Sequence, residues 1–228
     1  MTKRITIQTD KTLEDIYLLL LNEFGFRNWW PGDTQDEIII GAILTQNVNW
    51  SNVEKAIENL KQNCLLNLKS IHESEISIIA PLIKPTRFYN QKSIKLKNFS
   101  DYLFSNYSGS LDSMFGQSLV TLRQELLNLK GLGNETVDSI LLYAGDKPIF
   151  VVDTYTQRIL SKLGMQTLGW QYKEYKRFFM KNLKTDVELY KDFHAQIVYW
   201  GHFICKAKER ICLECPIAQH CKEEKLKK

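Results

Sequence analysis

The sequence predicts an all-α fold. Over most of its 228 residues, apolar side chains recur at steps of three and four, the spacing that places them on one face of a helix. The only run typical of a strand, IFVV at 149–152, is too short to support a sheet. With 44% hydrophobic residues the chain can bury a packed core, so we expect one large or two modest globular domains.

The first predicted helix follows Thr12, which suits an N-cap, and carries an apolar stripe over 13–24. Another begins at Ser51, where Glu54 three residues later completes a capping-box pattern. Periodicity predicts further helices at 36–45, 88–104, 118–129, 135–144, 154–163, 171–183 and 187–205. Breaks are predicted at Pro81, Pro85 and Pro148, and the last marks where a first set of helices gives way to a second.

The opening segment MTKRITIQTD is polar, and the LLLL run at 18–21 is far shorter than a bilayer span, which needs about 20 apolar residues. We therefore expect a cytosolic protein without membrane contact. The net charge is only +4, but KPTRFYNQKSIKLK at 84–97 holds five basic residues and no acidic one. A basic helix face is most often simply solvated, although the interleaved aromatic residues favour a surface for a polyanion.

Four cysteines near the C-terminus form the most specific motif. They are Cys205, Cys212, Cys215 and Cys221, with the spacing C-x6-C-x2-C-x5-C. Disulfides are rare in the cytosol, so this spacing predicts metal ligation. One compact loop of four thiols favours an iron–sulfur cluster; zinc and four buried structural thiols are the alternatives. Cys64 lies outside the motif and is predicted to be a small buried residue on a helix.

The stretch LKGLGNETVDSI at 129–140 predicts two helices joined by a tight turn. Gly131 and Gly133 would supply a permissive backbone, and Asn134 is a good N-cap for the second helix. Amide groups at such a helix start can bind a phosphate oxygen. A Gly-x-Gly turn is also often only a connector, so the turn alone leaves both interpretations open.

Three motifs, in this order, resemble the helix-hairpin-helix DNA glycosylases of the endonuclease III superfamily. LKGLGNETVDSILLY is similar to their hairpin, VVDTYTQRIL at 151–160 to the segment with their catalytic aspartate, and the four cysteines to their iron–sulfur loop. WWPG at 29–32, ILTQNVNW at 43–50 and RFYNQK at 87–92 are most similar to the 3-methyladenine DNA glycosylase III branch.

The resemblance implies an all-α, two-lobed helix-hairpin-helix glycosylase fold. Residues 27–147 would form a helical barrel lobe with the hairpin, and residues 148–228 a lobe with the catalytic aspartate and the cluster loop, joined by the N-terminal helix in 1–26. The implied cofactors are a 4Fe-4S cluster and a monovalent cation at the hairpin. The implied partner is double-stranded DNA with a damaged base, flipped out of the duplex and bound by a monomer.

The resemblance gives Asp153 the catalytic role. N-glycosidic cleavage develops positive charge on the sugar, which a nearby carboxylate stabilises while it activates water. Asp153 also suits an N-cap of the helix that follows, and the two roles are compatible. Glu135 occupies the position of the lysine that forms a Schiff base in bifunctional relatives. A carboxylate cannot form that imine, so we expect base removal by water; an acidic residue also simply favours a helix's first turn.

The remaining site residues are predicted in two groups. Contacts to the DNA backbone would come from Gly131, Leu132, Gly133, Asn134 and Lys92, and the base pocket and wedge from Trp29, Trp30, Trp50, Gln46 and Asn47. Alkylated purines are cationic and stack well on indole faces, although aromatic residues are more often core. The predicted reaction is therefore monofunctional release of an alkylated purine such as 3-methyladenine. Alternatives are an oxidised-pyrimidine or mismatch glycosylase, a catalytically silent DNA-damage binding module and a zinc-stabilised interaction protein.

Overall fold

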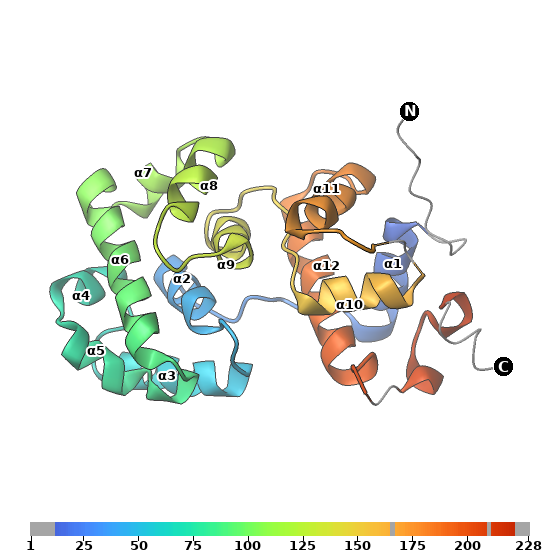
Figure 1. Ribbon diagram of the computed structural model, residues 1–228, viewed down its shortest axis with the longest axis horizontal. Helices are drawn as coiled ribbons and strands as arrows, with labels where there is room; N and C mark the ends of the chain where they lie inside the picture. The colour runs from blue at the N-terminus through green and yellow to red at the C-terminus, as the bar shows by residue number, and fades with distance from the viewer. Residues whose placement is uncertain (1–11, 165–166, 209–210, 222–228) are drawn as a thin grey trace. The chain divides into compact units, whose positions relative to one another are not determined.

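The computed structural model describes residues 12–164, 167–208 and 211–221, and within these ranges the regular structure is helical throughout (Figure 1). The predicted all-α class is therefore confirmed. The chain divides into two compact units, Met1–Trp29 together with Pro148–Lys228, and Trp30–Lys147. None of the described helices combines the length and apolar character needed to cross a membrane.

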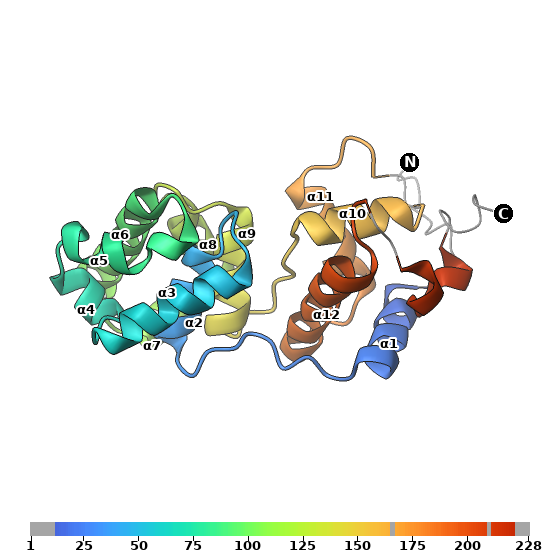
Figure 2. The ribbon, with the colours of Figure 1, turned by 90° about the horizontal axis from the view of Figure 1, so that it is seen from below.

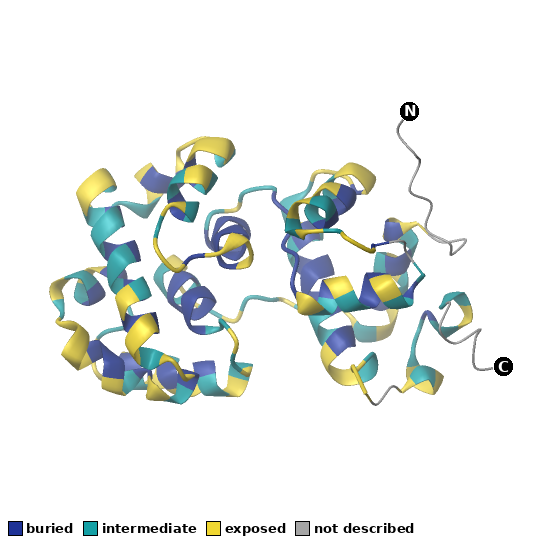
Figure 3. Cartoon of the chain, viewed as in Figure 1, coloured by how far each residue is buried: buried dark blue, intermediate teal, exposed yellow. Residues whose placement is uncertain are grey.

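The unit Trp30–Lys147 is built around α2 (Gln35–Leu44). The other elements of this unit are α3 (Trp50–Gln62), α4 (Leu68–Glu73), α5 (Ile76–Leu82), the 3-10 turn η1 (Lys84–Thr86), α6 (Tyr89–Tyr107), α7 (Leu111–Phe115), α8 (Leu119–Leu127), α9 (Asn134–Ser139) and the π-helical turn η2 (Ile140–Ala144). α2 contacts α3, α6, α9 and η2. Its side chains Ile39, Ile40 and Ile43 are fully buried, and each contributes about 1.5–3 kcal/mol by leaving water. Most of α2 is coloured as buried in Figure 3.

The second unit packs α1 (Leu13–Phe24) and α10 (Thr154–Lys162) against α12 (Val187–Tyr199) (Figure 2). It also contains α11 (Tyr172–Asn182), the π-helical turn η3 (Trp200–Ile204) and the short turns η4 (Cys212–Glu214) and η5 (Ala218–His220). Its core is aromatic: the Phe150 ring stacks on Phe179 at 4.0 Å between centroids. Phe150 belongs to the IFVV run, which is buried but forms no strand.

Caps explain where several helices begin. The predicted N-cap Thr12 is confirmed, and it forms a capping box: its hydroxyl accepts from Asp15 N at 3.1 Å and its own N–H donates to the Asp15 carboxylate at 2.9 Å. The box predicted at Ser51 is wrong, because the helix already begins at Trp50 after the N-cap residue Asn49.

Other departures from the sequence prediction are short or irregular elements. The helices α4, α5 and α7 have five to seven residues, too few to show a helical period. Pro81 lies within α5, one residue before its end, rather than at a break. Cys64 is exposed and follows α3 at φ 57°, so the prediction of a buried helical cysteine is wrong.

Candidate active site

The turn between α8 and α9 has an exposed backbone on both sides of one buried residue, Leu132. Leu132 is 6% exposed and its N–H donates to Leu129 O at 3.1 Å, whereas Gly131, Gly133 and Asn134 are exposed. Gly131 has φ 95°, which glycine adopts without strain. Gly133 is the N-cap, at an ordinary φ of −94°, and Asn134 is the first residue of α9. The prediction that Asn134 caps the helix is therefore off by one residue.

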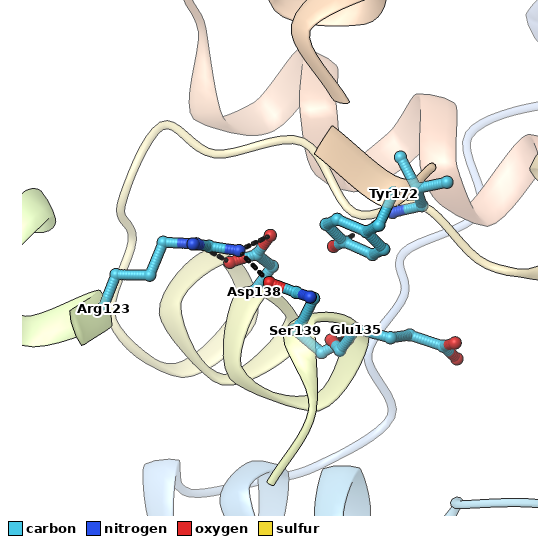
Figure 4. Close-up of polar contacts among 7 residues, drawn as sticks. Arg123, Glu135, Asp138, Ser139 and Tyr172 are labelled. Carbon is cyan, nitrogen blue, oxygen red and sulfur yellow. Dashed lines mark hydrogen bonds and ion pairs between the residues drawn. The ribbon is translucent and has the colours of Figure 1, made fainter. Parts of the chain in front are cut away.

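An ion pair between half-buried Arg123 and buried Asp138 joins α8 to α9 (Figure 4). Arg123 donates from Nε to Asp138 Oδ1 at 2.6 Å and from Nη2 to Asp138 Oδ2 at 3.2 Å, and Asp138 is fully buried. Nη2 also donates to Asn134 Oδ1 at 2.6 Å. Losing one partner of such a pair costs about 3–5 kcal/mol, because the other charge stays buried. This pair is not among the site residues predicted from the sequence, although a lone aspartate in the apolar stretch TVDSILLY is a signal for it.

Glu135 lies in the first turn of α9 and is exposed. Its carboxylate extends away from the Arg123–Asp138 pair (Figure 4), while its main-chain oxygen accepts from Ser139 Oγ at 2.8 Å. This bond uses the main chain of Glu135, so it does not depend on the side chain at that position.

Gln46 bonds to the hairpin through its amide nitrogen and to α6 through its amide oxygen. Its Nε2 donates to Thr136 Oγ1 at 2.8 Å and to Gly131 O at 3.3 Å, and its Oε1 accepts from Lys95 Nζ at 2.5 Å. The Lys95 stem also covers Gly131, since a Cβ on that glycine would lie 2.7 Å from Lys95 Cε. Asn47 is exposed at φ 54°, so of the two predicted wedge residues it is the one that faces solvent.

Lys92 was predicted to contact the DNA backbone, and the structure contradicts this. The residue is 2% exposed, and its Nζ donates to Leu44 O at 2.8 Å and to Thr86 O at 2.7 Å. Burial, and next the nearby charge of Lys95, lowers the pKa of Lys92 to about 8. Lys92 is a structural cation whose charge is satisfied by two carbonyl groups, so it cannot reach a phosphate.

Trp30 and Trp50 line one open pocket in the unit Trp30–Lys147. Their rings meet edge to face at 5.3 Å between centroids, so a base can stack on one indole but not between the two. The charged groups of the pocket are three glutamates and one lysine: Glu37, Glu54, Glu58 and Lys61. An aromatic pocket with more acidic than basic groups suits a cation. Trp29 is half-buried and belongs to the other unit.

Asp153 caps α10, as the sequence predicted. The carboxylate is buried, and Oδ1 accepts from Thr156 N and from Thr156 Oγ1, both at 2.7 Å. The N–H of the preceding residue, Val152, donates to Tyr172 Oη at 3.4 Å. These bonds hold the carboxylate in one position, which a group acting on a defined substrate atom requires.

The environment of Asp153 contains a neutral histidine. His194 Nε2 lies 3.9 Å from Asp153 Oδ2, and both side chains are buried. Burial lowers the pKa of His194, and the Asp153 charge opposes this only in part. At neutral pH the imidazole is uncharged, so it cancels none of the carboxylate's negative charge.

All four motif cysteines line one pocket, together with apolar residues that include Ile159, Leu163 and Trp200. Burial raises the pKa of Cys215 to about 11 and also raises that of Cys205. Among the described residues, no three cysteine, histidine or carboxylate side chains lie close enough together to bind one metal ion. Binding of a metal centre would therefore bring the thiols closer together and release their protons. A ligand set of four cysteine sulfurs suits an iron–sulfur cluster or a zinc ion.

Comparisons with known proteins agree with this geometry. A Methanocaldococcus jannaschii protein, whose name assigns it to the DNA repair glycosylases, is 45% identical over 208 residues, which cover 90% of this chain and 94% of the relative. Endonuclease III of Thermotoga maritima is 28% identical over 185 residues, 81% of each chain. The crystal structure of H. pylori 3-methyladenine DNA glycosylase bound to 1,N6-ethenoadenine matches with a TM-score of 0.72 at 32% identity, over 82% of this chain and 95% of that one.

A family model described as the HhH-GPD superfamily of base excision DNA repair proteins matches residues 40–185, more than half of the chain. This range contains the hairpin, Glu135 and Asp153, and the fold is that of the helix-hairpin-helix glycosylases. The chain therefore belongs to the HhH-GPD superfamily and is a DNA repair glycosylase.

Proposed function

We propose that the protein is a monofunctional DNA glycosylase that removes an alkylated purine from double-stranded DNA and leaves the strand intact. The proposal rests on two acidic residues: one at the position of the family's catalytic aspartate, and one at the position of the lysine that forms a Schiff base in bifunctional relatives. Asp153 is a buried carboxylate held by Thr156, and Glu135 stands where bifunctional relatives have lysine. The chain can thus stabilise the sugar cation and activate water, but it offers no amine at that position for a Schiff base.

The proposed substrate class rests on the pocket of Trp30 and Trp50. Alkylation at purine N3 or N7 gives a cationic base, which an indole face and nearby glutamates would attract. The similarity to the 3-methyladenine glycosylase at 32% identity supports the same class. The endonuclease III relative at 28% identity favours the second candidate, release of oxidised pyrimidines.

We also expect the protein to act as a monomer. The monovalent cation at the hairpin and the roles of Trp29 and Asn47 stay predictions.

A panel of duplexes decides between the substrate classes. We expect release of 3-methyladenine and 7-methylguanine, scored by alkali cleavage of the abasic product, but no release of thymine glycol or mismatched bases. Removing one stacking partner with Trp50→Ala should lower the specificity constant for the alkylated base by about 10-fold, since stacking is worth about 1–3 kcal/mol. Trp50→Phe keeps an aromatic face and should retain most of the activity. Release of oxidised pyrimidines alone would contradict the assignment.

We also propose that a 4Fe-4S cluster is bound by Cys205, Cys212, Cys215 and Cys221. The cluster would fix the loop formed by these cysteines against the apolar residues of the pocket. The purified protein should then be yellow-brown and contain about four irons and four sulfides per chain. Cys215→Ser should lose the colour and most of the iron. Cys64→Ser is the matched control, because this exposed cysteine lies outside the motif and its loss should change neither. A colourless protein with one zinc ion would refute the cluster.

A further inference from the structure

The turn that leads into α6 holds two consecutive residues at positive φ. Arg87 has φ 55° and ψ 164°, a combination that is otherwise used almost only by glycine. Phe88 follows in the left-handed region at φ 43° and ψ 32°, which is uncommon for a bulky residue. Such conformations lower stability, and they persist only where the surrounding structure imposes them.

The surroundings of this turn do impose it. Buried Lys92 binds the carbonyl oxygen of Thr86, the residue directly before Arg87, and Thr86 is fully buried, with its hydroxyl donating to Ile83 O at 2.8 Å. On the other side, Phe88 O accepts from Lys92 N at 3.0 Å. The main chain is thus fixed before and after Arg87, and the residue keeps a backbone in which glycine would be less strained.

Packing does not explain why an arginine stands there. Arg87 is exposed, and among the described residues no hydrogen bond or ion pair to its guanidinium is recorded. The segment 84–100 contains no acidic residue, and the neighbouring Phe88 is 63% exposed. A charged group displayed at a cost in stability and without an internal partner indicates an external anion.

The turn is connected to the hairpin within the same unit. Lys92 joins Thr86 to Leu44, the last residue of α2, and the loop after α2 carries Gln46, which bonds to Gly131 of the hairpin. Two side chains therefore link the Arg87 turn to the hairpin. A duplex bound at the hairpin and at the Arg87 turn would contact two hydrogen-bonded parts of the same unit.

From these observations we infer that Arg87 binds a phosphate of the DNA backbone and is a second DNA contact apart from the hairpin. This inference rests on the proposed function, because the anion that it names is the nucleic acid substrate. Arginine suits the role because its planar guanidinium can bond to two oxygens of one phosphate.

Three substitutions at this position separate charge from strain. Arg87→Gln removes the charge and keeps the strained backbone, so the dissociation constant for duplex DNA should rise about 3- to 10-fold while the melting temperature stays unchanged. The slope of log K against log salt should fall by about 0.9, the contribution of one phosphate contact. Arg87→Gly should weaken binding equally but raise the melting temperature by about 3 °C or more, because glycine relieves the strain. Arg87→Lys should retain the slope.

Two controls match these changes. Ser108→Gly relieves another positive φ, at 52° and at the other end of α6, and should raise the melting temperature without altering DNA affinity. Lys69→Gln removes an exposed positive charge paired with Glu73 at 3.9 Å and should leave the salt slope unchanged.

The outcomes distinguish this inference from the proposed function. If Arg87→Gln binds DNA with the wild-type constant and slope, Arg87 is no phosphate contact, although wild-type binding and base release would keep the proposed function intact. If the wild type binds no DNA, the proposed function and the Arg87 contact both fail. A lower melting temperature for Arg87→Gly would refute the strain argument.

Discussion

Asp153→Asn lowers the single-turnover rate of base release by about 100-fold or more and leaves the fold intact. The expected loss follows from the chemistry, because a general base or a charge placed at the developing cation contributes about 100- to 10,000-fold. The amide of asparagine is neutral and cannot take a proton from water. The rate is measured on a duplex that the wild type processes, with a thermal melt to test folding.

The fold survives because asparagine caps a helix about as well as aspartate. Its amide oxygen can still accept from Thr156 N, which now bonds to Asp153 Oδ1 at 2.7 Å. The variant therefore removes the charge and keeps the cap. Neutral His194 beside the carboxylate supplies no replacement charge, since burial keeps its pKa low.

The matched control is Asp186→Asn. Asp186 caps α12 in the same unit, and its Oδ1 accepts from Leu189 N at 3.1 Å. The chemical change is the same as at Asp153, so base release by Asp186→Asn should equal that of the wild type. Equal release by the Asp153 and Asp186 variants would remove Asp153 from the mechanism. Absence of base release by the wild type would instead favour a silent binding module.

The sequence predicted those parts of the fold that depend on local pattern. Long amphipathic helices such as α1, α10 and α11 begin within one residue of the predicted positions, because caps and apolar periodicity are both encoded locally. The π-helical turns η2 and η3 continue helices predicted at 135–144 and 187–205, and their changed hydrogen bonding leaves no clear mark in the apolar spacing.

The site residues show where local pattern fails. Lys92 belongs to a basic run that resembles a phosphate-binding surface, yet it points into the core, where the carbonyl oxygens of Leu44 and Thr86 bind it. Leu44 lies in α2, far from the run in sequence, so the run itself could not reveal that its carbonyl oxygen binds Lys92. The same holds for Gln46, whose bonds to Gly131 and Thr136 span about 90 residues of sequence. Burial of a polar side chain is a tertiary property, and one sequence does not report it.

Glu135→Lys should give the protein a lyase activity that the wild type lacks. A lysine here restores the amine that bifunctional relatives use to attack the sugar, so borohydride should trap the variant on a duplex containing an abasic site. We expect a covalent complex and strand cleavage with the variant and neither with the wild type. Both are read as shifted bands on a denaturing gel.

The structure favours a folded variant. Glu135 is exposed in the first turn of α9, and the bond from Ser139 Oγ uses its main-chain oxygen rather than its carboxylate. Replacing an anion with a cation at a helix start costs about 0.3–1 kcal/mol, far less than the loss of the Arg123–Asp138 pair. The hairpin should therefore keep its shape and its affinity for DNA.

Asp112→Lys separates the position of the amine from the change in charge. Asp112 is an exposed acidic residue in the first turn of α7, in the same unit as Glu135, so the substitution adds the same two charges. Any general gain in DNA affinity appears in both variants, but only Glu135→Lys places an amine on the hairpin. Crosslinking by both would show that a nearby lysine of any origin suffices. Strong crosslinking by the wild type would show that another amine of this chain forms the imine, and the strand would then not be left intact.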